Sequence, residues 1–68
     1  MTKTITLNGK SITLEQSDTI ADFTMEMKIT GTMYVIEKNG KIVNKEDYAA
    51  EPVVHGDVLE LVGLVGGG

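Results

Sequence analysis

Hydrophobic and polar residues alternate in two short segments near the start of the chain, 4–7 and 11–14, with Asn8 and Gly9 between them. An alternation with a period of two is typical of a strand with one buried face. An Asn-Gly pair between two such strands predicts a type I′ turn, whose central residues both have positive φ, and therefore a β-hairpin. Four aliphatic residues are expected on its buried face: Ile5, Leu7, Ile12 and Leu14.

The next segment has the spacing of an amphipathic helix, because its apolar residues recur at positions i, i+3 and i+7. Thr19 directly precedes this segment, and Asp22 lies in its first turn. Together they resemble a capping box with Asp in place of Glu. Gly31 is a suitable stop signal, so we expect a helix of two to three turns over residues 20–29. The apolar stripe of this helix consists of Ile20, Phe23 and Met27.

The middle of the chain predicts a second pair of strands. Residues 32–37 are rich in β-formers and mostly apolar, which favours a central strand of a sheet. Asn39 and Gly40 form a second Asn-Gly turn, and a short strand begins at Ile42.

The remaining elements complete a small α+β domain. Residues 45–50 predict a single polar turn of helix, which Pro52 interrupts, and residues 58–62 predict the last strand. One helix would then cover one face of a small mixed sheet, within a domain of residues 1–62. If Leu59 and Leu61 point inward, Val62 points to the opposite face and is exposed, which makes it a candidate contact residue.

Glycines dominate the last residues of the sequence. Gly66, Gly67 and Gly68 follow the last strand after only three other residues. Glycine loses the most conformational freedom on folding and has no side chain to pack, so it is a poor core element. We therefore expect residues 63–68 to form a flexible tail that carries the Gly68 carboxylate into the active site of another protein. A frayed chain end is the alternative.

Composition narrows the classes of function. Ten acidic residues face six basic ones, giving a net charge of −4, so nucleic acid is an unfavourable partner. The chain has no cysteine, which excludes disulfides, thiolate nucleophiles and thiolate metal ligands. The start of the sequence has no apolar signal-peptide core, and no segment approaches the length of a membrane helix. We expect a soluble, cytoplasmic protein that is monomeric when free.

Other candidate residues have simpler explanations. His55 has no nucleophile motif or second histidine near it, so we interpret it as a solvated turn residue. Asp57 is expected to stabilise its own turn. Met25, Met27 and Met33 are interpreted as core or gap-filling residues, with a docking role for one of them as the alternative.

Three segments of the second half carry a family resemblance: NGKIV at 39–43, HGDVLELV at 55–62 and VGGG at 65–68. With the order of the predicted elements, they resemble the sulfur carrier proteins of thiamine biosynthesis. The resemblance implies a ubiquitin-like β-grasp fold: a small mixed sheet packed on one helix, with a flexible C-terminal glycine tail.

The resemblance also implies a function. A ubiquitin-activating-type adenylyltransferase would use ATP and magnesium to convert the Gly68 carboxylate into an acyl-adenylate. Sulfur from a cysteine desulfurase would then give a thiocarboxylate, and thiazole synthase would accept the sulfur. Gly66 and Gly67 keep the tail thin, and Leu64 and Val65 are its only side chains able to bind a partner. This chain itself is expected to bind no cofactor and to be no enzyme.

Two other functions remain open at this point. Carriers of other sulfur pathways, such as the small subunit of molybdopterin synthase, share the β-grasp fold and a Gly-Gly end. Ubiquitin-like modifiers use the same end to label lysines.

Overall fold

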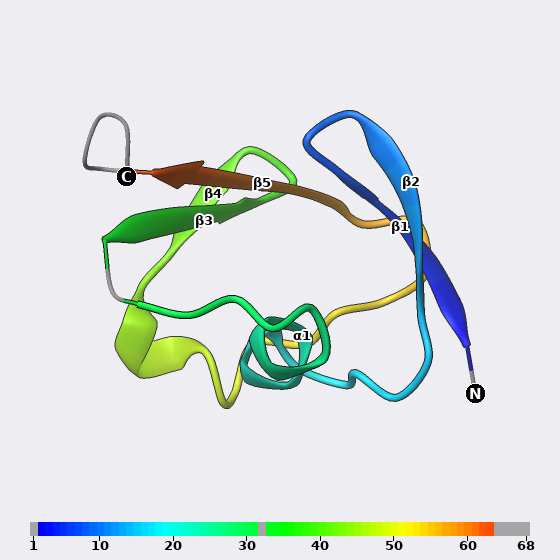
Figure 1. The fold of residues 1–68 in the computed structure, drawn as a ribbon, viewed down its shortest axis with the longest axis horizontal. Helices are drawn as coiled ribbons and strands as arrows, with labels where there is room; N and C mark the ends of the chain where they lie inside the picture. Colours follow the sequence, from blue (N-terminus) through cyan, green and yellow to red (C-terminus); the bar gives the residue numbers. More distant parts are fainter. Residues whose placement is uncertain (1, 32, 64–68) are drawn as a thin grey trace.

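The computed structural model describes residues 2–31 and 33–63 of the chain. A five-stranded sheet forms one layer, and a single α-helix packs below it (Figure 1). The elements are β1 (Lys3–Leu7), β2 (Lys10–Leu14), α1 (Ile20–Glu26), β3 (Tyr34–Lys38), β4 (Lys41–Val43), the 3-10 helix η1 (Lys45–Asp47) and β5 (Val58–Gly63).

The sheet is mixed, with the strand order β2-β1-β5-β3-β4. β1 and β5 pair in parallel, and the other neighbouring strands pair antiparallel. The prediction of an α+β fold with a small mixed sheet is confirmed. The prediction of a central strand over residues 32–37 is confirmed in kind, because β3 (Tyr34–Lys38) is an internal strand that lies between β5 and the edge strand β4. The middle position of the sheet belongs to β5.

Both predicted type I′ turns are confirmed. Asn8 and Gly9 have φ values of 50° and 84°, and Asn39 and Gly40 have 52° and 87°. In each hairpin two residues connect the strands, so that Leu7 faces Lys10 and Lys38 faces Lys41. The turn type fixes the register of each hairpin and thus which residues face the core.

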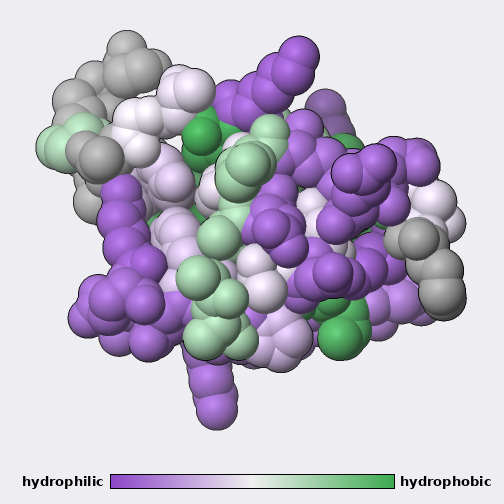
Figure 2. Space-filling model, turned by 90° about the horizontal axis from the view of Figure 1, so that it is seen from below, coloured by the Kyte–Doolittle hydropathy of each residue, from purple (hydrophilic) through white to green (hydrophobic). Residues whose placement is uncertain are grey.

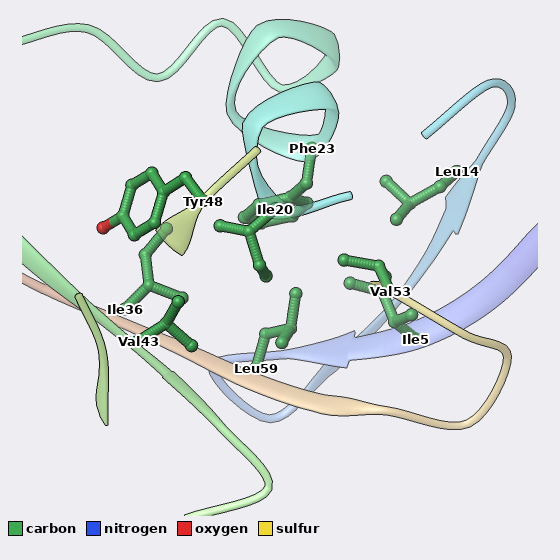
Figure 3. Packing of buried hydrophobic residues seen from close by; sticks show 9 residues of the cluster. All are labelled: Ile5, Leu14, Ile20, Phe23, Ile36, Val43, Tyr48, Val53 and Leu59. Atoms are coloured by element: carbon green, nitrogen blue, oxygen red, sulfur yellow. The ribbon is translucent and has the colours of Figure 1, made fainter. Parts of the chain in front are cut away.

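The core lies between the sheet and α1 (Figure 3). Ile20 and Phe23 of α1 are fully buried, as are Ile5 of β1 and Leu59 of β5. Four other residues predicted to pack there, Leu7, Ile12, Met27 and Leu61, are partly buried against this cluster. The complete buried set is Ile5, Leu14, Ile20, Phe23, Ile36, Val43, Tyr48, Val53 and Leu59.

Two core residues, Tyr48 and Val53, come from the irregular segment between η1 and β5. This segment crosses near the N-terminus of α1, where Ile20 N–H donates to the Glu51 carbonyl at 2.9 Å and Ala21 N–H donates to the Tyr48 carbonyl at 2.9 Å. The segment has no hydrophobic period, and its contribution to the core was therefore not predicted.

The helix ends three residues earlier than the predicted boundary of 20–29. Its last residue is Glu26, and Lys28 adopts a φ of 57°, in the left-handed region. The closing hydrogen bonds run from Lys28 N–H to the Met25 carbonyl (3.1 Å) and from Ile29 N–H to the Thr24 carbonyl (2.9 Å). These two bonds form a Schellman motif, which usually has glycine at the left-handed position. Because lysine occupies it here, the sequence pointed to Gly31 instead.

The interpretation of the methionines as core residues is wrong for two of the three. Met25 is 76% exposed and Met33 is 57% exposed, whereas Met27 packs partly buried against the core. Met25 lies two residues after the buried Phe23 on α1, and residues two apart on a helix do not share a face, so its side chain points away from the core. Seen from the side on which α1 lies, a few hydrophobic residues are scattered among hydrophilic ones (Figure 2).

Side-chain carboxylates hold the loop before α1. The predicted capping box is confirmed: the Thr19 hydroxyl accepts from Asp22 N–H at 3.2 Å, and the Asp22 carboxylate accepts from Thr19 N–H at 3.1 Å. Glu26, one helical turn later, accepts hydrogen bonds from Glu15 N–H, Gln16 N–H and the hydroxyl of the buried Ser17.

These hydrogen bonds stabilise the ionised form of Glu26. The bond from the backbone of Glu15 and then the bond from the Ser17 hydroxyl hold the pKa of the Glu26 carboxyl below its ordinary value. A lowered pKa in the folded state stabilises the fold above the unfolded pKa, and this stabilisation is lost as the pH falls through the folded pKa.

Replacing Glu26 by Gln should therefore lower the free energy of unfolding at pH 7, because one of the two oxygens that accept these hydrogen bonds becomes an NH2 group, which cannot accept them. The difference from the parent should shrink below a pH of about 4.3, the pKa of an unperturbed glutamate, as the parent carboxyl itself becomes protonated. Urea unfolding at several pH values measures this. Glu46→Gln, on the exposed η1, is the matched control and should change little. A Glu26→Gln effect that stays constant down to pH 3 would contradict the account.

Candidate functional site at the end of β5

The candidate site begins where β5 ends. Leu59 is fully buried and Leu61 is partly buried, so both point toward α1. Val62 points to the opposite face and is 47% exposed, as its position in the alternation predicted. Gly63, the first residue of the predicted tail, is the last residue of β5 and pairs with Tyr34. The other predicted tail residues, Leu64, Val65, Gly66, Gly67 and Gly68, lie outside the described residues.

The asparagine of the first turn fixes the second half of β5. The parallel register between β1 and β5 ends at Leu7 and Leu59, and Asn8 then continues it. Asn8 donates its backbone N–H to the Leu59 carbonyl at 3.0 Å. Its side-chain oxygen accepts from Leu61 N–H at 2.8 Å, and its side-chain NH2 donates to the Leu61 carbonyl at 3.3 Å. The side chain thus replaces the next residue of a strand.

The asparagine of the second turn fixes the start of β5. Asn39 donates its backbone N–H to the Val58 carbonyl at 2.7 Å, and its side-chain oxygen accepts from Val58 N–H at 2.9 Å. The side-chain NH2 of Asn39 donates to the Asp57 carboxylate at 3.0 Å. The sequence predicted both asparagines as turn residues, but nothing in it identified their contacts with β5.

Asp57 links this turn to the loop before β5. It is 6% exposed, and its second carboxylate oxygen accepts from Val54 N–H at 2.9 Å. The predicted local role is confirmed by the bond to Val54, and the bond to Asn39 adds a long-range one. Its burial is compensated because both of its side-chain oxygens accept hydrogen bonds.

His55 is exposed in the turn before β5, and its Nδ1 atom accepts from Thr4 N–H at 3.1 Å. The hydrogen bond gives the ring a structural role. In residues 2–31 and 33–63, no group of three or more His, Cys, Asp or Glu could hold a metal ion. The same part of the chain contains no helix long and apolar enough to cross a membrane.

In the described residues, the single α-helix covers one face of the sheet, and no helix covers the outer face opposite α1 (Figure 1). Val62 pairs there with Val35 of β3, and Glu60 pairs with Glu37. The two glutamates are like charges directly opposite one another, an arrangement that destabilises a sheet. Ile42 of β4, next to Glu37, is 64% exposed. This face therefore combines aliphatic and acidic side chains next to the end of β5.

A mixed five-stranded sheet that packs a single helix on one face is a β-grasp architecture of the ubiquitin-like type. The model of the ThiS family matches residues 2–68, and the chain belongs to the ThiS family. A crystal structure of the thiamine biosynthesis protein ThiS from Geobacter metallireducens matches with a TM-score of 0.82 and 26% identity, over 96% of this chain and 99% of that one.

Two further proteins are similar to this chain in sequence. The sulfur carrier protein ThiS of Bacillus subtilis is 33% identical over 63 residues, which cover 91% of this chain and 96% of that protein. A thiazole synthase of Paramagnetospirillum magneticum is 33% identical over 64 residues, which cover 94% of this chain but 20% of that protein. The second protein therefore contains a ThiS-like segment within a much longer chain.

Asn8→Gly should test how β5 is held, because glycine keeps the positive φ of the turn and removes the side-chain hydrogen bonds to Leu61. We expect a loss of about 1 kcal/mol in the free energy of unfolding and faster hydrogen exchange at the Leu61 amide. Asn8→Asp, which keeps an oxygen acceptor for Leu61 N–H, should retain that amide's protection. If hydrogen exchange at the Leu61 amide is unchanged in Asn8→Gly, the Asn8 side chain does not protect that amide. The hydrogen bonding between the first turn and β5 would then end at Leu59.

Proposed function

We propose that this chain is the sulfur carrier for thiazole formation in thiamine biosynthesis, and that the Gly68 carboxylate carries the sulfur. The observation that supports this most directly is the family match, which extends through the glycines to residue 68. The name and nearly full-length match of the Bacillus subtilis protein support the same function. They favour the thiazole pathway over the molybdopterin carriers and protein modifiers that share the fold.

The chemistry explains why a partner enzyme is needed. A carboxylate is a poor electrophile, because attack on it must expel oxide. An adenylyltransferase of the ubiquitin-activating type would transfer AMP from ATP to the Gly68 carboxylate, with magnesium neutralising the phosphates and pyrophosphate leaving. Sulfur from a persulfide donor, charged by a cysteine desulfurase, would then displace AMP. A thiol must cleave the remaining S–S bond, so that the sulfur stays on Gly68 as a thiocarboxylate.

The length of the tail suits this chemistry. Five residues follow Gly63, and an extended chain spans at most about 3.5 Å per residue, so the acyl carbon can reach about 17 Å beyond the sheet. Glycines at the end let the thread enter a narrow channel that a Cβ would obstruct. Leu64 and Val65 would contribute binding energy, about 1.5–3 kcal/mol for each fully buried side chain before ordering costs.

Three partner enzymes are proposed for the activation of the chain and the transfer of its sulfur. The thiocarboxylate sulfur is a soft nucleophile, and thiazole synthase is the proposed acceptor. The Paramagnetospirillum magneticum protein supports this pairing, because a protein named thiazole synthase contains a segment similar to nearly all of this chain. The adenylyltransferase and the cysteine desulfurase are proposed from the family resemblance and from the chemistry that the Gly68 carboxylate requires. In this scheme the chain is a carrier, and its partners supply the catalysis.

The test is to incubate the chain with its adenylyltransferase, ATP, magnesium and a persulfide donor. Intact-mass spectrometry should show one oxygen replaced by sulfur, and fragmentation should place the change on Gly68. A variant with one extra alanine after Gly68 is the matched control. It keeps the whole body and tail but moves the carboxylate beyond the position of the nucleotide, so we expect no modification.

Equal thiocarboxylation of the extended variant and the parent would contradict the proposal. An isopeptide bond between Gly68 and a lysine of another protein, in place of a thiocarboxylate, would favour the protein modifiers. A thiocarboxylate that molybdopterin synthase consumes and thiazole synthase ignores would favour the other sulfur pathway.

A further inference from the structure

Gly63 differs from the other glycines of the described part of the chain. Gly9, Gly31, Gly40 and Gly56 have φ values between 84° and 91°, in the region that side-chain-bearing residues rarely adopt. The backbone therefore requires glycine at those four positions. Gly63 has no positive φ, and a Cβ built on it meets no heavy atom of the described residues within 4 Å. Neither backbone geometry nor packing within this part of the chain explains it.

A glycine at the end of a strand also has a cost. It loses more conformational freedom on folding than any other residue and has no side chain to pack against its neighbours, so it weakens the strand. Glycine inside a sheet is often compensated by an aromatic ring on the neighbouring strand, which covers the bare backbone. Tyr34 is the direct partner of Gly63 and is the obvious candidate for this compensation.

The position of the Tyr34 ring excludes that explanation. A Cβ at Gly63 would have contacted a ring lying over the glycine, but it meets nothing within 4 Å. The ring instead faces Lys45 of η1, whose Nζ lies 4.4 Å from the ring centroid. The bare backbone of Gly63 is therefore covered neither by the Tyr34 ring nor by another side chain of the described residues.

We propose that Gly63 is a clearance position, where the adenylyltransferase that acts on the tail packs directly against the backbone at the end of β5. The inference rests on the proposed function. A strand that leaves glycine where its own fold does not need it is typical of a place where another chain approaches closely. Gly63 immediately precedes the tail, so the mouth of the channel that receives the tail must close around this residue.

The two last residues of β5 would then have complementary roles. Val62 presents an exposed aliphatic side chain to the outer face of the sheet. A side chain at position 63 would point to the face that carries Leu59 and Leu61, beside Tyr34. The partner would thus contact the end of β5 on both faces of the sheet. On the outer face it would contact the Val62 side chain, and on the other face it would contact the backbone of Gly63.

The experiment is a series of increasing side-chain size, Gly63→Ala, Gly63→Val and Gly63→Leu, assayed by ATP–pyrophosphate exchange with the purified adenylyltransferase. KM for the carrier should rise with size, by about tenfold or more for Val and Leu, while kcat changes less. The unfolding midpoint should stay equal to that of the parent or rise, since each replacement favours a strand over glycine. Thr13→Val, on the edge strand β2, is the control and should leave KM unchanged.

Each outcome decides between the explanations. An unchanged KM across the series, with an active parent, would overturn the clearance role alone. A full loss already at Ala, with no further loss at Val or Leu, would also overturn it and would identify Gly63 as a hinge. If the parent gives neither exchange nor a thiocarboxylate, the proposed function fails, and the clearance role falls with it.

Discussion

The pairing of β5 with two turn asparagines determines where the reactive end of this protein emerges. β5 is the last strand in sequence, but it lies in the middle of the sheet. Asn39 bonds Val58 at its start, and Asn8 bonds Leu59 and Leu61 further along. Both asparagines can do this because positive φ values in type I′ turns place them beside β5. The two asparagines thus hold β5 at its start and as far as Leu61, while its last side chain, Val62, stays exposed.

This arrangement separates stability from chemistry. The core joins α1 to the inner face of the sheet, and the carboxylates of Asp22 and Glu26 hold the loop before α1. None of these groups is needed for acyl activation, which requires one carboxylate on a thin thread. The outer face, with its valines and its paired glutamates, contributes little to the core and is available for recognition. A domain near the lower size limit for a stable core can therefore present a reactive C-terminal carboxylate to a partner enzyme.

The sequence predicted the elements with a local signal and missed those that depend on distant contacts. Both hairpins were predictable from Asn-Gly pairs, and the start of α1 from its capping box. The end of α1 was not, because Lys28 takes a position usual for glycine. Tyr48 belongs to the core although it lies in an irregular segment, and Asn8 bonds a residue of a distant strand. Neither contact produces a hydrophobic period in the sequence from which it could be predicted. Val62 was predictable from alternation alone, whereas the role proposed for Gly63 required the position of the Tyr34 ring.

The central claim is that the folded body supplies recognition and the tail supplies the reacting group. It is tested most directly by comparing the whole chain with a synthetic peptide of residues 58–68 in adenylyltransferase-catalysed ATP–pyrophosphate exchange. Both have the same Gly68 carboxylate, but only the whole chain presents the sheet. We predict that kcat/KM for the peptide is lower by about 100-fold or more, equivalent to about 2.8 kcal/mol of lost binding. Equal kcat/KM values would contradict the claim and leave the β-grasp body without a role in activation.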